Sequence, residues 1–330
     1  MRIALSLAGQ GVGLTRPNPP VGAVVVKRCR ISGRGYHAKA GEPHAEIHAL
    51  KAAGKKAKGA TLYVTLEPCC THGRTPPCTD AIIASGIKRV VYGCVDPNPA
   101  HAGRADAILK NAGIAVTRDV LAVECAALIR PFAMRLLHQR PYVTLKLACT
   151  LDGKIADARG TSKWITGTMA RETVQMLRRS ADAIMIGAET LRADDPSLLP
   201  RPDESRQPYR VIIKGTRSLP RKSRVFNDEA SERTLVYEGK RGLKLILREL
   251  ARRDVMHVVC EGGGKLAESL LRADVVDELW LFYAPKILGG RAISSVAGAG
   301  WTLASAPHFS IVEMKQIGND FLVRLEKRHV

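Results

Sequence analysis

The chain has 330 residues, of which 45% are hydrophobic and 25% charged, and its formal net charge is +20 at pH 7. A chain of this length is longer than most domains with a single hydrophobic core, so we expect two domains. No apolar run approaches the roughly 20 residues that span a bilayer, so we expect no membrane partner. The strong positive charge raises the question of nucleic-acid binding. That charge is spread over both halves and only 5% of residues are aromatic, so we expect small phosphorylated ligands and no nucleic acid.

The cysteine pattern indicates a reducing compartment. Eight cysteines lie scattered along the chain without the spacing of a disulfide framework, and no signal-peptide pattern follows Met1. Reduced thiols are typical of the cytoplasm, so we predict a cytoplasmic protein. The stretch RIALSLA after Met1 resembles the middle of a helix, which suggests that a few residues precede it.

The first 120 residues alternate strand-like and helix-like segments. A β-branched run predicts a strand at 21–27, followed by turn residues and the sequence GRGYH. The segment 106–116 has a helix pattern, a glycine and a strand pattern in succession. Between these two segments we predict helices at 44–57 and 78–87 and strands at 60–68 and 88–95. Such alternation predicts a layered α/β domain.

A second α/β domain follows the segment LIRPFAMRLLHQRP. We place the boundary between a first domain, 1–139, and a second domain, 140–330. A strand leading into a turn at 142–156 starts the second domain, and strand and helix patterns alternate after it. The last two apolar runs, FSIVEMKQIG and DFLVRLEKR, predict a closing hairpin.

The loop LEPCCTHGRTPPCTD, residues 66–80, combines three cysteines and a histidine. His44 and Glu46 open the preceding helix, Cys69 follows a strand, and Cys78 opens the next helix. One histidine and two cysteines supply three zinc ligands and leave the fourth tetrahedral position to water, as in catalytic sites. Glu46 is then placed to transfer protons. The sequence matches the zinc-deaminase signature H-x-E…P-C-x-x-C except that eight residues separate the two cysteines.

Two alternatives compete with a catalytic zinc site at this loop. A structural zinc site needs a fourth protein ligand, for which Cys70 and His72 are available. A disulfide between Cys69 and Cys78 requires an oxidising compartment, which the rest of the chain does not indicate.

Five sequence blocks add specificity to the loop. Together they resemble the deaminase half of bifunctional riboflavin-biosynthesis enzymes. In chain order the blocks are NPPVGAVVV (18–26), AGEPHAEIHAL (40–50), AKGATLYVTLEPC (57–69), CTHGRTPPC (70–78) and DPNP (96–99).

The resemblance implies a cytidine-deaminase-like, three-layer α/β/α domain. By the same resemblance, His44, Cys69 and Cys78 bind zinc, and Glu46 is the proton donor and acceptor. It also implies hydrolytic deamination of a diaminopyrimidinone that carries a phosphoribosylamino group. We expect Asn18 to hydrogen-bond the pyrimidine. Cys70 stands where the family usually has serine, and we interpret it as an isosteric replacement.

The second half contains no G-x-G-x-x-G after its first strand, so a standard Rossmann domain is unsupported. It does contain CEGGGKLAESLL (260–271), which predicts a strand, a glycine-rich turn and a helix. Backbone N–H groups at such a helix start can bind a pyrophosphate. The motif alone is weak because turns of this kind are often purely structural.

Further blocks are similar to the reductase half of the same enzymes. They are LKLACTLDGKIA (145–156), SKWITG (162–167), LRRSADAIMIGAETLRADDPSL (177–198), RVII (210–213) and VDELWLFYAPKILGG (276–290). The resemblance implies a dihydrofolate-reductase-like α/β fold, reduction of a ribosyl group to ribityl by NADPH, and a homo-oligomer. The positions that match the family's cofactor contacts are Ala148, Trp164, Thr190, Asp194, Gly215, Gly263, Gly264, Lys265, Leu266, Ala267, Glu268 and Ser269. Those that match its substrate contacts are Ser162, Arg178, Leu198, Arg201 and Glu261.

Simpler interpretations and several departures accompany this second resemblance. Trp164 could be a core residue and Arg178 a surface charge. Leu199 replaces the family's threonine, Gly215 its common serine and Gly264 its usual proline. We therefore keep two rival functions: a deaminase acting on RNA through a C-terminal binding module, and an enzyme whose reductase half is only a scaffold.

One departure suggests a function of its own. Lys214 stands where the family favours aspartate. A lysine at that position changes the charge beside the expected cofactor, and we hypothesise that it binds the 2′-phosphate of NADPH.

Overall fold

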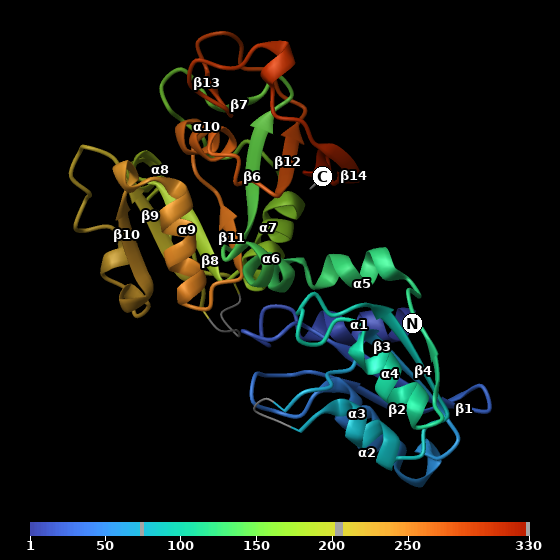
Figure 1. The fold of residues 1–330 in the computed structure, drawn as a ribbon. Helices are drawn as coiled ribbons and strands as arrows, with labels where there is room; N and C mark the ends of the chain where they lie inside the picture. Colours follow the sequence, from blue (N-terminus) through green and yellow to red (C-terminus); the bar gives the residue numbers. More distant parts are fainter. Residues whose placement is uncertain (73–75, 202–206, 328–330) are drawn as a thin grey trace. The chain divides into compact units, whose positions relative to one another are not determined.

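The computed structural model describes residues 1–72, 76–201 and 207–327. The chain forms two compact units, Met1–Gln139 and Arg140–Val330. Figure 1 shows the elements of both units. Among the described residues, no helix is long and apolar enough to cross a membrane.

A five-stranded mixed sheet forms the centre of the first unit. Its strand order is β2-β1-β3-β4-β5. β1 runs antiparallel to both of its neighbours, whereas β3, β4 and β5 are parallel. The strands are β1 (Gly22–Lys27), β2 (Arg30–Tyr36), β3 (Thr61–Leu66), β4 (Arg89–Cys94) and β5 (Ala115–Thr117).

Helices cover both faces of this sheet (Figure 1), which confirms the predicted three-layer arrangement. The helices are α1 (Arg2–Gln10), α2 (Ala45–Ala53), α3 (Cys78–Ala84), α4 (Arg104–Asn111), α5 (Ala122–Leu128) and α6 (Arg130–His138). On one face α2, α3 and α4 bury Ala49, Ile82 and Leu109 in the main core of the unit. On the other face Cys125 of α5 packs with Cys94 and with residues near α1.

The strand β2 was not predicted, because the sequence RISGRGY has the glycines of a turn. Gly33 and Gly35 instead let α2 pack directly on the strand backbone. A Cβ atom at Gly33 would lie 2.1 Å from the carbonyl oxygen of Ala49, and one at Gly35 would lie 2.5 Å from that of Ala45. Only glycine permits this approach.

The predicted helix at 44–57 is shorter than expected. α2 ends at Ala53 because Gly54 adopts φ +52°, and the remaining residues form the 3-10 turn η1 (Gly54–Ala57). His44 stands at the N-cap position with extended backbone angles, so Glu46 lies in the first turn of the helix.

An eight-stranded sheet forms the centre of the second unit, in the order β10-β9-β8-β11-β6-β12-β15-β14. The six strands from β10 to β12 are mutually parallel, so their carboxyl ends meet at one edge. β15 is antiparallel to both of its neighbours. The strands are β6 (Tyr142–Thr150), β8 (Ala183–Gly187), β9 (Tyr209–Lys214), β10 (Thr234–Glu238), β11 (His257–Cys260), β12 (Glu278–Ala284), β14 (Ser310–Ile317) and β15 (Asp320–Glu326).

The hairpin of β14 and β15 confirms the predicted closing hairpin, with Gly318 at φ +62° in its turn. A separate pair is formed by β7 (Lys154–Ala156) and β13 (Ile293–Ser294). Short 3-10 turns occupy connections: η2 (Arg224–Phe226), η3 (Ser231–Arg233), η4 (Gly239–Arg241) and η5 (Leu303–Ser305).

Two helices cover each face of the large sheet. α9 (Leu243–Arg252) and α10 (Gly264–Arg272) pack on one face around a core that includes Leu145, Met185 and Leu247. α7 (Thr168–Ser180) and α8 (Ala188–Asp194) bury Leu177 and Leu191 on the other face. With helices on both faces, the functional groups of a parallel sheet gather at the carboxyl edge of its strands.

Candidate active sites

Three residues from separate elements meet in the first unit. His44 caps α2, Cys69 follows β3, and Cys78 is the first residue of α3. The Sγ atoms of Cys69 and Cys78 lie 3.5 Å and 3.3 Å from the Nδ1 atom of His44. All three donor atoms lie within 4.8 Å of one another.

The donor set fits a zinc ion. Zinc–sulfur bonds of about 2.3 Å and zinc–nitrogen bonds of about 2.0 Å place tetrahedral ligands roughly 3.5 Å apart, which matches the observed spacing. The thiols of Cys69 and Cys78 share a hydrogen bond, which lowers the pKa of Cys69 and raises that of Cys78. A low pKa favours the thiolate, which is the form that binds metal.

Glu46 lies against this cluster in the first turn of α2. Its side chain is buried, with a residue exposure of 4%. Burial, followed by the nearby Cys69, raises the pKa of Glu46 to about 7. A carboxyl group with a pKa near neutrality can both accept and release a proton at physiological pH.

Neither alternative ligand joins the three donors. The Sγ atom of Cys70 points to His101, whose Nδ1 atom lies 3.8 Å away, and His72 is exposed. Within the described residues, the only metal-binding group of three or more ligands is His44, Cys69 and Cys78. Cys69 and Cys78 are both free thiols, so no disulfide joins them. A site with three protein ligands is typical of catalytic zinc.

Asn18 is held beside the cluster by His37, a residue that the sequence did not single out. The Nδ2 atom of Asn18 lies 3.1 Å from Nε2 of His37, and Nδ1 of His37 lies 3.2 Å from the carbonyl oxygen of Pro43. A carbonyl can only accept, so Nδ1 carries the proton and Nε2 accepts from Asn18. The rings of His37 and His44 pack edge to face with centroids 5.2 Å apart.

A second unpredicted residue fixes the DPNP loop. Glu67 is buried, and its carboxylate accepts hydrogen bonds from the backbone N–H groups of Asp96, Gly103 and Ala105 at 3.0–3.2 Å. These bonds tie the loop and the start of α4 to the segment that carries Cys69. The bonds from His37 to Asn18 and from Glu67 to the DPNP loop join residues that are distant in sequence, so no local sequence pattern predicts them.

In the second unit, many of the residues matched to the cofactor lie at the carboxyl edge of the parallel strands. Ala148 is near the end of β6, Thr190 lies on α8 directly after β8, Gly215 follows β9, and Gly263 follows β11. The backbone N–H of Gly263 donates to Oγ1 of Thr190 at 3.1 Å, which joins the turns after β8 and β11.

The start of α10 fits the diphosphate of a dinucleotide. The first turn of the helix contains no acidic residue. Within the described chain, no group accepts a hydrogen bond from the backbone N–H of Gly264 or Lys265. Unpartnered N–H groups at a helix start bind phosphate oxygens. A Cβ atom at Gly264 would lie 2.4 Å from the carbonyl oxygen of Ser294, so glycine at this position lets β13 pack closely on the start of α10.

Arg178 is a half-buried partner of Glu261, which excludes a simple surface charge. Its Nε and Nη2 atoms donate to the two carboxylate oxygens at 2.6 Å and 2.9 Å. Lys146 lies 4.0 Å from the same carboxylate. Burial would raise the pKa of Glu261, but the charges of Arg178 and Lys146 hold it below its usual range.

Ser162, Trp164 and Asp194 lie close together. Ser162 Oγ donates to Oδ1 of Asp194 at 3.2 Å, and Lys163 forms an ion pair with the same carboxylate at 3.9 Å. Trp164 is 63% exposed, with the guanidinium of Arg171 4.6 Å from its ring centroid, so it is not a core residue.

The other residues that match the family's cofactor and substrate contacts differ in whether their side chains are exposed to a ligand. Leu198, Leu266 and Ala267 have buried side chains, and the backbone N–H groups of Leu266 and Ala267 already donate to the carbonyl oxygen of Gly263. Arg201 is exposed, and its backbone N–H donates to Gln175. On α10 the other polar side chains bond within the helix or point to solvent: Glu268 to Arg272, Ser269 to the carbonyl of Lys265, and Lys265 to solvent.

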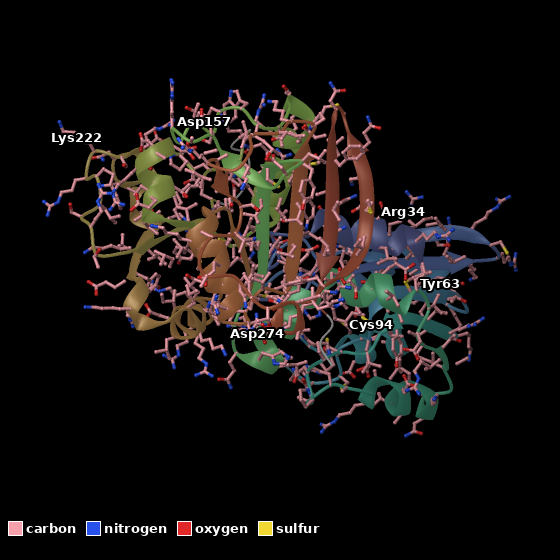
Figure 2. All side chains as sticks on the ribbon, turned by 90° about the horizontal axis from the view of Figure 1, so that it is seen from above. Arg34, Tyr63, Cys94, Asp157, Lys222 and Asp274 are labelled. Atoms are coloured by element: carbon pink, nitrogen blue, oxygen red, sulfur yellow. The ribbon has the colours of Figure 1, made fainter. Side chains whose placement is uncertain are left out.

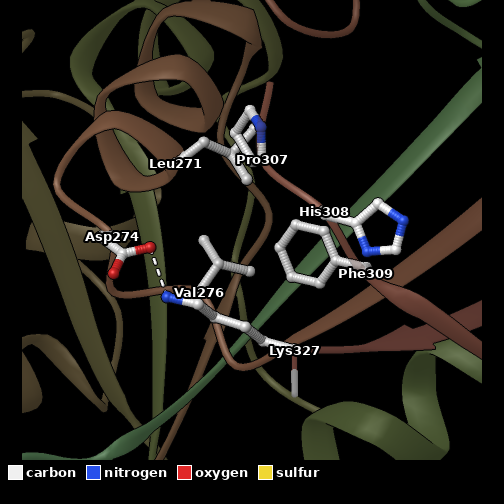
Figure 3. Close-up of a pocket in the computed structure, with 7 residues that line it drawn as sticks. All are labelled: Leu271, Asp274, Val276, Pro307, His308, Phe309 and Lys327. Atoms are coloured by element: carbon white, nitrogen blue, oxygen red, sulfur yellow. Dashed lines mark hydrogen bonds and ion pairs between the residues drawn. The ribbon is translucent and has the colours of Figure 1, made fainter. Parts of the chain in front are cut away.

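A small pocket of the second unit lies away from these residues. Figure 3 shows an apolar floor of Leu271, Val276 and Phe309, beside an ion pair between Asp274 and Lys327. It opens near the start of β12 and the end of β15, at the edge opposite the carboxyl ends of the parallel strands. None of the predicted site residues lines it.

Comparisons with known proteins agree with the two sites. Residues 1–94 match the family model of the cytidine and deoxycytidylate deaminase zinc-binding region, and residues 141–323 match that of the RibD C-terminal domain. The riboflavin biosynthesis protein RibD of Aquifex aeolicus is 47% identical over 311 residues, covering 88% of this chain and 87% of that protein. The Escherichia coli RibD is 41% identical over 359 residues, covering 98% of both chains.

Solved structures of RibD proteins are also similar to this chain over nearly its whole length. The structure of Acinetobacter baumannii RibD (form 1) covers 99% of this chain and 98% of its own, with a TM-score of 0.90 and 37% identity. A Thermotoga maritima diaminohydroxyphosphoribosylaminopyrimidine deaminase/5-amino-6-(5-phosphoribosylamino)uracil reductase covers 99% and 97%, with a TM-score of 0.91 and 41% identity.

Fold and sites therefore define a bifunctional enzyme, with a zinc-dependent deaminase domain followed by a reductase domain. The cofactors of this arrangement are zinc and NADPH. The chain belongs to the RibD family of riboflavin biosynthesis.

Proposed function

We propose that the first unit deaminates 2,5-diamino-6-(5-phosphoribosylamino)pyrimidin-4(3H)-one and that the second reduces the ribosyl group of the product to ribityl. The observation that carries this proposal is the convergence of His44, Cys69 and Cys78 beside a buried Glu46. It is supported by the name of the Thermotoga maritima relative, which is similar over nearly the whole chain.

In the first unit, His44, Cys69 and Cys78 would hold the zinc ion. When bound, zinc activates water for attack at neutral pH. Glu46 takes a proton from the water and delivers it to the departing ammonia, as its raised pKa allows. Asn18 keeps its Oδ1 atom and one N–H for the pyrimidine, because its other N–H is used by His37.

In the second unit, bound NADPH would supply a hydride for reduction of the ribosyl group. The N–H groups at the start of α10 bind the cofactor diphosphate. Arg178 and Glu261 orient each other through their bidentate pair, and with Ser162 and Arg201 they meet the phosphorylated substrate. Leu198 contributes its backbone only, because its side chain is buried.

We also propose where the enzyme is located and how its chains assemble. All eight cysteines are free, which supports a cytoplasmic enzyme. We further propose a homo-oligomer, and a partner range limited to phosphorylated small molecules without nucleic acid or membrane.

The deaminase step is tested by ammonia release. Zinc-loaded protein given the diaminopyrimidinone phosphate without NADPH should release one ammonia per substrate. Protein stripped of zinc with a chelator should release none, and added zinc should restore release. Ammonia release that persists without zinc would contradict the proposal.

A further inference from the structure

We propose that Lys214 recognises the 2′-phosphate of NADPH and sets the preference of the second unit for NADPH over NADH. The proposal rests on the proposed reductase function and assigns a specificity residue to it. Lys214 is the last residue of β9, at the carboxyl edge of the parallel strands.

The strand order fixes which end of the cofactor lies near Lys214. Glu261 follows β11, and Lys146, which lies 4.0 Å from its carboxylate, is on β6. β6 and β8 flank β11 on opposite sides. Because Glu261, a predicted substrate contact, lies beside Lys146 on the β6 side, a dinucleotide whose diphosphate binds at the start of α10 would extend its adenosine over β8 and β9.

The reach is adequate for a direct contact. Neighbouring strands are about 4.8 Å apart, so the end of β9 lies roughly 10 Å from the turn after β11. An adenosine ribose attached to the diphosphate covers most of this distance, and the flexible four-carbon side chain of lysine covers the rest. The bond from Gly263 to Thr190 joins the turn after β11 to the helix after β8, so these two segments lie side by side for one ligand.

The space beside Lys214 is open. A Cβ atom at Gly215 would meet nothing within 4 Å, and Gly215 itself is exposed. Lys214 is half-buried, so its stem is anchored while the ammonium group can reach the surface.

The charge of Lys214 is available for a ligand. Its cross-strand neighbour is Glu238 on β10, but the carboxylate of Glu238 pairs with Lys240 at 3.0 Å. Among the described residues, Lys214 forms no ion pair within 4.0 Å. Arg217, three residues further on, is exposed but pairs with Glu189 at 3.8 Å, so it adds no free positive charge here. The charges of Lys240 and, to a lesser degree, Lys214 lower the pKa of Glu238, but that carboxylate is bonded to Lys240, so the half-buried Lys214 ammonium can still bind a phosphate dianion.

Binding of adenosine 2′,5′-bisphosphate and of 5′-AMP by calorimetry tests the proposal, because the two probes differ only in the 2′-phosphate. In the unmodified enzyme the bisphosphate should bind at least about tenfold tighter, equal to about 1.4 kcal/mol. In Lys214→Met this advantage should fall to within about threefold, with 5′-AMP binding unchanged. Lys222→Met removes an exposed lysine from the same β9–β10 connection (labelled in Figure 2) and should keep the full advantage.

Three results would overturn the proposal and are distinguishable. An undiminished advantage in Lys214→Met would show that another group binds the 2′-phosphate. Equal weakening of both probes would show that Lys214 only supports the local structure. If the unmodified enzyme bound neither probe and no NADPH, the reductase assignment itself would fail.

Discussion

A single residue, Ala45, separates His44 from Glu46, and the two side chains have different roles. His44 is the N-cap residue with extended angles and directs Nδ1 to the two thiols, whereas Glu46 is helical and buried. One short turn thus supplies both a metal ligand and a proton carrier. The helix start also favours a negative charge at Glu46 once its proton has left.

Glu46→Gln should abolish proton transfer while keeping the shape of the side chain. We expect the deamination kcat to fall by about 10²–10⁴-fold, the range for loss of a general acid–base, and the zinc content to stay unchanged. Steady-state ammonia release and metal analysis measure the two quantities. Glu42→Gln, at an exposed position just before the same helix, is the control and should keep activity.

Cys70 and Cys78 form a matched pair for testing the metal site. Cys78→Ser removes one of three ligands, so bound zinc should fall well below one per chain. Cys70→Ser should retain both zinc and activity, because the Cys70 thiol points to His101 and away from the cluster. A loss of zinc in Cys70→Ser would instead support a four-ligand structural site.

At the scale of elements, the packing of α2 on β2 positions the deaminase site. Gly35 faces the first turns of α2, where an added Cβ atom would lie 2.5 Å from the carbonyl oxygen of Ala45 and 2.6 Å from the N atom of Ala49. α2 begins directly after His44, so a shift of this helix would move the metal ligand.

Gly35→Ala should therefore destabilise the first unit by about 1–3 kcal/mol, the range for overpacked cores, and weaken zinc binding. Gly9→Ala is the control, because a Cβ atom there meets nothing within 4 Å and Gly9 lies inside α1. It should be neutral or stabilise by up to about 1 kcal/mol. The melting temperature of the apo and zinc-loaded protein measures both effects, and equal behaviour of the two variants would contradict this packing argument.

Local patterns predicted most elements of the first unit and the hairpin at the end of the second. They missed β2, because its glycines serve a neighbouring helix that the strand sequence does not reveal. They also missed the roles of His37, whose hydrogen bond with Asn18 spans 19 residues, and of Glu67, whose hydrogen bond with Asp96 spans 29. The convergence of His44, Cys69 and Cys78 was predictable because zinc chemistry restricts residue types so strongly.

The net charge of the whole chain is +20, which raises the question of whether it binds a polyanion such as tRNA or only keeps the surface well solvated. We expect no tRNA binding in a filter assay at about 150 mM salt, since binding by phosphate contacts weakens steeply with salt and aromatic platforms are scarce. Retention of tRNA at this salt would favour an RNA substrate over a mononucleotide-sized one.

We propose that the two sites of this chain act in sequence on one substrate. The most direct measurement adds the phosphoribosyl diaminopyrimidinone to zinc-loaded protein with NADPH and follows absorbance at 340 nm together with ammonia. We predict that absorbance falls after ammonia release begins, and that neither change occurs in Glu46→Gln, because only the deaminated product is reduced. Ammonia release with constant absorbance would contradict an active reductase half, and a fall in absorbance without ammonia would contradict the order of the two steps.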